Sequence, residues 1–141
     1  MVYILGDVVW GGDFSVLNKL NGQKIVIKGN HDKQHDLKNA VINNYICSWY
    51  VQKNLTVGQD FIYLQHFPCS SWERSSHNSY HAYGHQHGTG SFSVGRSMDV
   101  SVDCINFTPV HVEEFIIKLQ DRNNFNLYYK SGEVKDLRSA K

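Results

Sequence analysis

Polar side chains that could bind a metal ion follow short apolar runs at four places in the sequence. They are Gly6-Asp7, Gly29-Asn30-His31-Asp32, the isolated His66, and Gly84-His85-Gln86-His87. Glycines beside these residues let the backbone turn sharply and approach closely. One carboxylate, one amide oxygen and three imidazoles form a mixed nitrogen and oxygen ligand set, which suits Mn, Fe, Co, Ni or Zn better than Mg or Ca. The residues therefore predict one polar pocket that holds a divalent transition metal.

Two apolar runs position the first two groups. Residues 2–5 and 25–28 have the composition of buried strands, and a short helix is expected between them at residues 14–20, capped by Asp13. The strands of such a β-α-β unit are parallel, and the loops that follow them leave the same edge of the sheet. We therefore expect Asp7 to lie beside Asn30 and His31.

The rest of the chain alternates strand and helix signals. Residues 48–55 and 61–65 predict a hairpin that places His66 at its exit, and residues 82–83 predict a short strand before Gly84. Residues 98–104 alternate apolar and polar side chains as a strand does, whereas residues 112–119 carry apolar residues at helical spacing. The mixture predicts an α/β fold.

Length and composition limit the class of protein. The 141 residues predict a single domain over 1–141, and 41% hydrophobic residues suffice for a core. A net charge of +1 without charge runs argues against duplex nucleic-acid binding, and no apolar stretch approaches a membrane span of about 18 residues. We therefore expect a cytoplasmic protein without a membrane segment. Three cysteines without a CxxC spacing predict reduced thiols, buried as small hydrophobic residues.

Taken in order, the polar segments resemble the sequence blocks of the calcineurin-like metallophosphoesterases. Those blocks are D-x-H, G-D, G-N-H-D/E, a lone His and G-H-x-H, and the last four are present between Gly6 and His87. The resemblance is to the small bacterial and phage members of the family. It implies a layered α/β sandwich with mixed sheets. It also implies hydrolysis of a phosphomono- or phosphodiester substrate by metal-activated hydroxide.

The resemblance also assigns a role to each residue. Asp7 would bridge two metal ions, manganese among the candidates, and Asn30, His66 and His85 would complete the second metal site. His87 would belong to the first site. His31 would be catalytic without binding metal, because in the family it faces the phosphate and stabilises or protonates the departing oxygen.

The first block of the family is missing. Only six residues precede Asp7, whereas a strand needs about 5 residues and a crossover at least about 10–12. We therefore expect a sandwich that is N-terminally truncated by one strand and helix, with an impaired first metal site and one or two bound ions. A start of the chain further upstream, and a catalytically weak or inactive metal-binding or assembly protein of the same fold, are the alternatives. The missing strand would leave residues 2–5 as an exposed edge, which predicts a homodimer.

Structural interpretations compete at several of these residues. Asp7 alone could be a turn carboxylate that caps the next helix, and a lone His66 could be a hydrogen-bonded core histidine; the ordered companions favour metal binding at both. Trp10 and Trp72 are interpreted as core or rim residues rather than substrate platforms. The remaining histidines match no block and are expected in solvated loops: His35, His77, His81 and His111.

Overall fold

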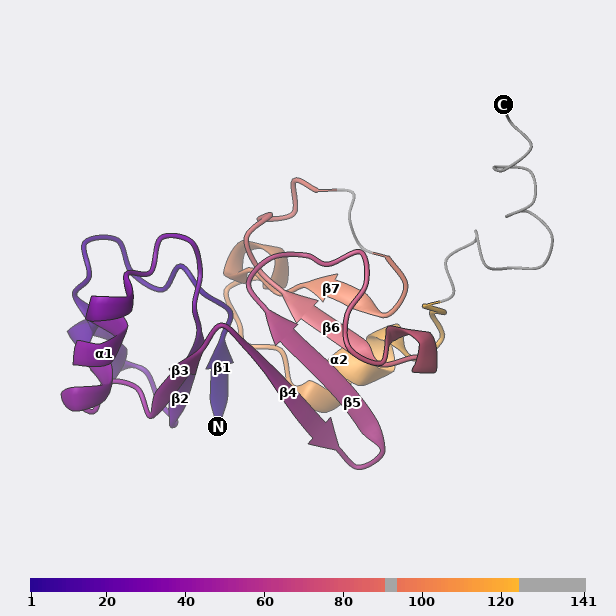
Figure 1. Cartoon of the computed structure of the whole chain (residues 1–141), viewed down its shortest axis with the longest axis horizontal. Helices are drawn as coiled ribbons and strands as arrows, with labels where there is room; N and C mark the ends of the chain where they lie inside the picture. The colour runs from indigo at the N-terminus through magenta and orange to yellow at the C-terminus, as the bar shows by residue number, and fades with distance from the viewer. Residues whose placement is uncertain (91–93, 125–141) are drawn as a thin grey trace.

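Two β-sheets form the centre of the protein in the computed structural model, which describes residues 1–90 and 94–124 (Figure 1). The first sheet has three parallel strands in the order β1 (Val2–Ile4), β2 (Lys24–Ile27) and β3 (Ser48–Tyr50). The second has four strands in the order β4 (Gln52–Val57), β5 (Asp60–Gln65), β6 (Tyr80–Tyr83) and β7 (Ser97–Asp99). β4 and β5 are antiparallel, whereas β5, β6 and β7 are parallel. The expected α/β fold with mixed sheets is confirmed.

The β-α-β unit at the start of the chain has the expected form. β1 and β2 pair in parallel with Tyr3 opposite Ile25, and the connection contains a 3-10 helix, η1 (Phe14–Lys19). The Asp13 carboxylate accepts a hydrogen bond from the Ser15 amide at 3.0 Å, so the predicted cap is confirmed. All four residues of β2 are buried, as is usual for a parallel strand covered on both faces.

A helix that the sequence analysis did not identify covers the first sheet. α1 (Gln34–Ile42) lies on the side of this sheet away from the second sheet (Figure 1). It buries Leu37 and Ala40 against a core that also contains Val26. The apolar stripe of α1 is narrow, so the spacing of its few apolar residues did not predict a helix.

The segment 48–55 is not one strand, which corrects the sequence-based prediction. Its first part is β3, which pairs in parallel with β2 in the first sheet, and its second part belongs to β4 in the hairpin. Val51 lies between them and is exposed, so the chain passes from one sheet to the other at this residue. The hairpin and the position of His66 directly after β5 are confirmed.

The segment 98–104 also differs from the prediction. Only Ser97–Asp99 form a strand, and Val102–Ile105 form a 3-10 helix, η3. The Asp99 carboxylate accepts hydrogen bonds from the Ser101 amide at 2.9 Å and the Ser101 hydroxyl at 2.6 Å. This local turn competes with strand pairing and ends β7.

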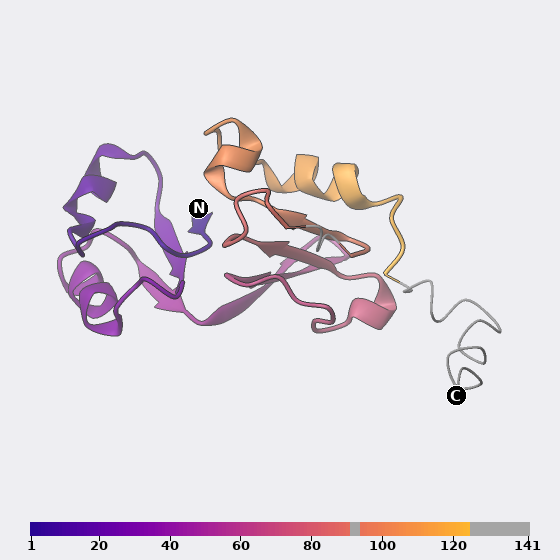
Figure 2. The same cartoon turned by 90° about the horizontal axis from the view of Figure 1, so that it is seen from above.

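The last described helix is where the sequence predicts it. α2 (Val112–Leu119) buries Phe115 and Leu119 against the face of the second sheet that carries Ile62 and Leu64 (Figure 2). A further 3-10 helix, η2 (Ser75–His77), lies in the loop before β6. Within the described residues, no helix combines the length and the apolarity that crossing a membrane requires.

The three cysteines are free thiols, as expected, but their predicted burial is wrong. Cys47 and Cys104 are exposed, and Cys69 is partly buried. Burial raises the pKa of the Cys69 thiol, so this group stays protonated to a higher pH than an exposed thiol.

Candidate metal centre

Four of the predicted polar segments meet where strands of the two sheets end. Asp7 follows β1, Asn30 and His31 follow β2, His66 follows β5, and His85 follows β6. The Gly84 amide donates to the His66 carbonyl at 2.9 Å, which holds the exits of β5 and β6 together. The carboxyl ends of parallel strands are the usual place for ligand sites in α/β folds. The topology therefore brings residues from four distant segments to one location.

The centre of this location is a cluster of three side chains. Asp7, His66 and His85 each offer one ligand atom, and these atoms all lie within 4.8 Å of one another. Nε2 of His66 is 3.3 Å from Oδ2 of Asp7 and 2.9 Å from Oδ1 of Asn30. His66 is only 2% exposed, whereas His85 is open to solvent. The cluster is thus buried on one side and accessible on the other.

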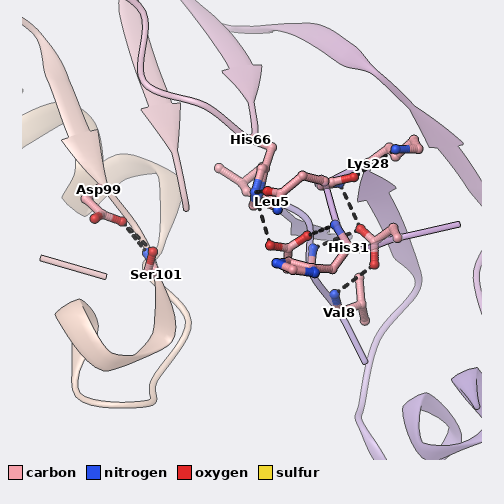
Figure 3. A network of polar contacts seen from close by, with 11 residues as sticks. Leu5, Val8, Lys28, His31, His66, Asp99 and Ser101 are labelled. Carbon is pink, nitrogen blue, oxygen red and sulfur yellow. Dashed lines mark hydrogen bonds and ion pairs between the residues drawn. The ribbon is translucent and has the colours of Figure 1, made fainter. Parts of the chain in front are cut away.

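The surroundings of His66 fit a cation. Nδ1 of His66 is 2.6 Å from the Leu5 carbonyl oxygen, which can only accept, so this nitrogen carries a proton (Figure 3). In the neutral ring Nε2 then has a lone pair, and it faces the oxygens of Asp7 and Asn30, which are also acceptors. Three acceptors directed at one point need a proton or a metal ion between them. A backbone carbonyl that fixes the ring nitrogen remote from the metal is a usual feature of histidine ligands.

A buried carboxylate holds the first two loops in register. Asp32 accepts hydrogen bonds from the amides of Asp7 and Gly29, both at 2.8 Å, and from the Val8 amide at 3.0 Å (Figure 3). It is 3% exposed. From the sequence, Asp32 was selected only as a member of the Gly29-Asn30-His31-Asp32 group of candidate metal-binding residues. The structure places Asp32 instead as the link between the loops that follow β1 and β2.

The carboxylate of Asp7 is oriented in the same way. Oδ1 accepts a hydrogen bond from the His31 amide at 2.8 Å, which leaves Oδ2 directed at His66. A methyl group on Gly29 would lie 2.1 Å from Oδ1 of Asp7 and 2.5 Å from its amide. Glycine at this position is therefore required by the close approach of the two loops.

Several candidate ligands have a left-handed backbone conformation. Asp7, His85 and His87 have φ values of 52°, 70° and 49°. Such a conformation costs a residue other than glycine about 1–3 kcal/mol and is enriched at functional sites. Three of the positions that the sequence analysis selected share this property, which is independent of their side-chain chemistry.

His87 and His31 do not join the cluster. Nδ1 of His87 is 2.8 Å from a carboxylate oxygen of Asp103, and both side chains are well exposed. The hydrogen bond from His87 holds the pKa of Asp103 below its usual value. The His31 ring lies against Trp10, with 4.4 Å between ring centroids, while its backbone amide contacts Asp7. Of the predicted metal ligands, Asp7, Asn30, His66 and His85 are thus together, and His87 is apart.

An aromatic residue that was not expected from the sequence, Phe67, lies beside the cluster. The Phe67 ring lies 4.5 Å from the His85 ring and 4.9 Å from the His66 ring, centroid to centroid. Together with Trp49, Asn30 and His66 it lines a cavity of about 380 Å³. Its position directly after the lone histidine is the signal that could have identified it.

His81 is a buried core residue, and the expectation that it is a solvated loop histidine is wrong. It lies in β6, is 0% exposed, and packs against the rings of Trp72 and Tyr83. Nδ1 is 3.1 Å from the Tyr63 carbonyl oxygen, and Nε2 accepts from the Cys69 amide at 3.2 Å. Burial, which disfavours the charged ring, lowers the pKa of His81 from 6.5 to about 4.

Comparison with known proteins shows the fold alone. The structure is similar to the crystal structure of AQ665, a protein of unknown function from Aquifex aeolicus, with a TM-score of 0.62 and 23% sequence identity. The match covers 83% of this chain and 74% of that chain. No protein-family profile matches the chain, and no curated protein matches it.

Proposed function

We propose that the protein is a metal-dependent phosphoesterase with the layered architecture of the calcineurin-like enzymes. The observation that carries the proposal is the convergence of Asp7, His66 and His85, with Asn30 beside them, at the exits of four strands. Their mixed nitrogen and oxygen donors suit a divalent transition metal such as manganese, iron, cobalt, nickel or zinc. The ordered sequence blocks that resemble that family support the same proposal.

The four side chains would hold one ion. When bound, it would act as a Lewis acid toward a phosphoryl oxygen and make a water molecule more acidic. His87, which would serve the first of two ions in the family, pairs with Asp103 here. We therefore propose one tightly held ion, with a second bound weakly or not at all.

His31 is the candidate catalytic residue of this site. Its backbone amide donates to the Asp7 carboxylate of the cluster, and its ring is exposed to solvent. Hydrolysis forms a bond from the oxygen of water to phosphorus and breaks the bond from phosphorus to the leaving oxygen. A protonated His31 would donate its proton to that leaving oxygen. The proton lost by the attacking water would pass to solvent, and solvent would reprotonate His31. The reaction would therefore depend on a ring that binds no metal.

A single experiment tests the proposal. The purified protein is stripped with a chelator, reloaded with Mn²⁺, and assayed with p-nitrophenyl phosphate and bis(p-nitrophenyl) phosphate. We expect hydrolysis of at least one ester, its loss in the stripped protein, and a decrease of at least about 100-fold in the variants Asp7→Asn and His31→Ala. His111→Ala is the matched control, because His111 is exposed at the start of α2 and pairs with Glu113.

The pairing of His87 with Asp103 favours a second candidate function. In this alternative the protein is an inactive or weakly active metal-binding or assembly protein, in which the same cluster holds an ion without catalysis. The two candidates differ in one result: this alternative predicts stoichiometric Mn²⁺ binding with no hydrolysis that depends on His31.

A further inference from the structure

Trp10 is the most exposed tryptophan of the protein and lies directly beside the candidate catalytic residue. It is 79% exposed, whereas Trp72 is buried and Trp49 is partly buried. Its ring centroid is 4.4 Å from that of His31. A single exposed aromatic side chain is not by itself a site. What distinguishes Trp10 from Phe107, which is 76% exposed, is its contact with the His31 ring. Because the Trp10 ring is exposed, a ligand can reach it from solvent.

Trp10 and His31 line a small cavity with a polar wall. The cavity has a volume of about 230 Å³, and Lys33 and Asp36 also line it. Sites for entire small molecules usually measure about 300–1,000 Å³, so this space suits one ring system of a larger ligand. The Asp36 carboxylate lies against the turn at Gly12, where a methyl group would be only 2.7 Å from Oδ2. It offers an acceptor for a hydroxyl or amino group of that ligand.

The position of the cavity identifies the part of the substrate that would occupy it. If His31 protonates the leaving oxygen, as proposed above, the leaving group must extend from His31 toward the neighbouring surface. The Trp10 ring, which contacts His31 and lines the same cavity, is part of that surface. A flat ring stacks on an indole with favourable dispersion and little loss of flexibility.

We propose that the substrate is a phosphoester whose leaving group carries a planar nucleobase-like ring, which stacks on Trp10, with Asp36 as an acceptor for its polar groups. This inference rests on the proposed function for the placement of the leaving oxygen. It adds the substrate class, a nucleoside phosphate, and a residue that determines specificity. Trp10 acts by contact with the ring and takes no part in bond cleavage.

The test uses two pairs of esters, and the members of each pair have the same reacting alcohol, the 5′-hydroxyl of ribose. The first pair is adenosine 5′-monophosphate, which carries a base, and ribose 5-phosphate, which does not. The methyl diesters of these two compounds form the second pair. For the Mn²⁺-loaded protein we expect kcat/KM to favour the nucleoside member of the hydrolysed pair. Trp10→Ala should reduce this preference by about 5- to 100-fold, and Trp10→Phe should retain most of it. The matched control is Phe107→Ala, another exposed aromatic residue, at which the preference stays at the wild-type value.

A binding measurement separates this inference from the proposed function. Calorimetric titration of the metal-free protein with adenosine 5′-monophosphate needs no turnover, and Trp10→Ala should weaken that binding by a similar factor. Absence of hydrolysis together with binding that depends on Trp10 would reject the phosphoesterase and retain the nucleobase site. Equal losses on both members of a pair would overturn the inference, because Trp10 would then only position His31. Absence of any preference for the nucleoside ester, in turnover and in binding, would also overturn it.

Discussion

Two carboxylates organise the two halves of the candidate centre, and they differ in burial. Asp32 accepts three hydrogen bonds from the loops after β1 and β2, and it is 3% exposed. Asp99 also accepts hydrogen bonds, two from Ser101 and one from the Gly88 amide at 3.0 Å among them, but it is only partly buried (Figure 3). Water competes for the bonds of Asp99 and not for those of Asp32.

The difference separates a preformed half of the site from an adjustable half. The loops tied by Asp32 place Asp7 and Asn30 before any ion binds. The Leu5 carbonyl in the first of these loops fixes the buried ring of His66, which belongs to the same half. The segment after β6, which carries His85 and His87, is exposed and has fewer buried contacts, so it opens at a lower free energy. The comparison predicts that ligands from the preformed half dominate metal affinity.

The largest expected effect concerns this metal affinity. We expect His66→Gln to lower the affinity for Mn²⁺ by more than about 100-fold. Even the loss of a residue that only orients a metal ligand lowers metal affinity by about 10–100-fold. His85→Gln should cost about 10-fold or more, and His87→Gln less than about threefold, because His87 pairs with Asp103. Calorimetric titration measures all three. Equal losses for His66→Gln and His87→Gln would show that the exposed segment closes over the ion, and the comparison would then be wrong.

The two carboxylates themselves provide the next test. Asp32→Asn replaces one acceptor oxygen by an amino group that faces buried amides, and we expect a loss of about 2–4 kcal/mol in the free energy of unfolding. Asp99→Asn makes the same chemical change in the exposed half and should cost less than about 1 kcal/mol. Urea denaturation, read by circular dichroism, gives both values. Similar losses in the two variants would contradict the assigned role of burial.

The preformed half is also the part that the sequence predicted best. Two apolar runs separated by a short capped helix can form few structures other than a parallel β-α-β unit, so the proximity of Asp7 to Asn30 followed directly. The hydrogen bonds of Asp32 to both loops were not predicted. They depend on a close approach of two backbones at Gly29 that no local pattern encodes.

The adjustable half was less predictable for a physical reason. The direction of His87 is set by Asp103, sixteen residues later, in a segment that was expected to be a strand and is partly a 3-10 helix. In the same way, β3 and β4 were merged because both have strand-like composition, and the change of sheet at Val51 is a tertiary effect. Local propensity identifies strands, but it does not assign them to a sheet.

A third test uses His81, which lies in β6 before the exposed segment that carries His85 and His87. Because the pKa of His81 is about 4 in the folded protein and near 6.5 in the unfolded chain, the unfolded state binds more protons between these values. The contribution of His81 to the free energy of unfolding is therefore fully present above pH 6.5, and it is lost as the pH falls toward 4. Between pH 7 and pH 5 we expect a loss of roughly 2 kcal/mol from this residue.

The same denaturation experiment at several pH values checks this expectation. His81→Gln should lower stability at pH 7 and remove most of the loss between pH 7 and pH 5, whereas His77→Gln, at an exposed histidine of η2, should leave the loss unchanged. A pH dependence that persists in His81→Gln would show that another group, and not this buried ring, is responsible.

The smallest expected effect is self-association through β1. Among the described residues β1 pairs only with β2, while Tyr3 and Ile4 pack against cores on opposite faces, so what stays open is the backbone edge. The Val2 amide donates to the Gln23 carbonyl at 2.7 Å, and alternation along a strand then directs the Tyr3 amide to the open edge. Pairing of two short edges buries less than the roughly 1,200–2,000 Å² of stable interfaces, so we expect a weak homodimer.

Sedimentation over a range of protein concentrations should show this homodimer. The Tyr3 amide should gain protection from hydrogen exchange as the concentration rises, while the Val2 amide does not. A monomer at every concentration, with no change at Tyr3, would show that this edge is not an interface between copies of the chain.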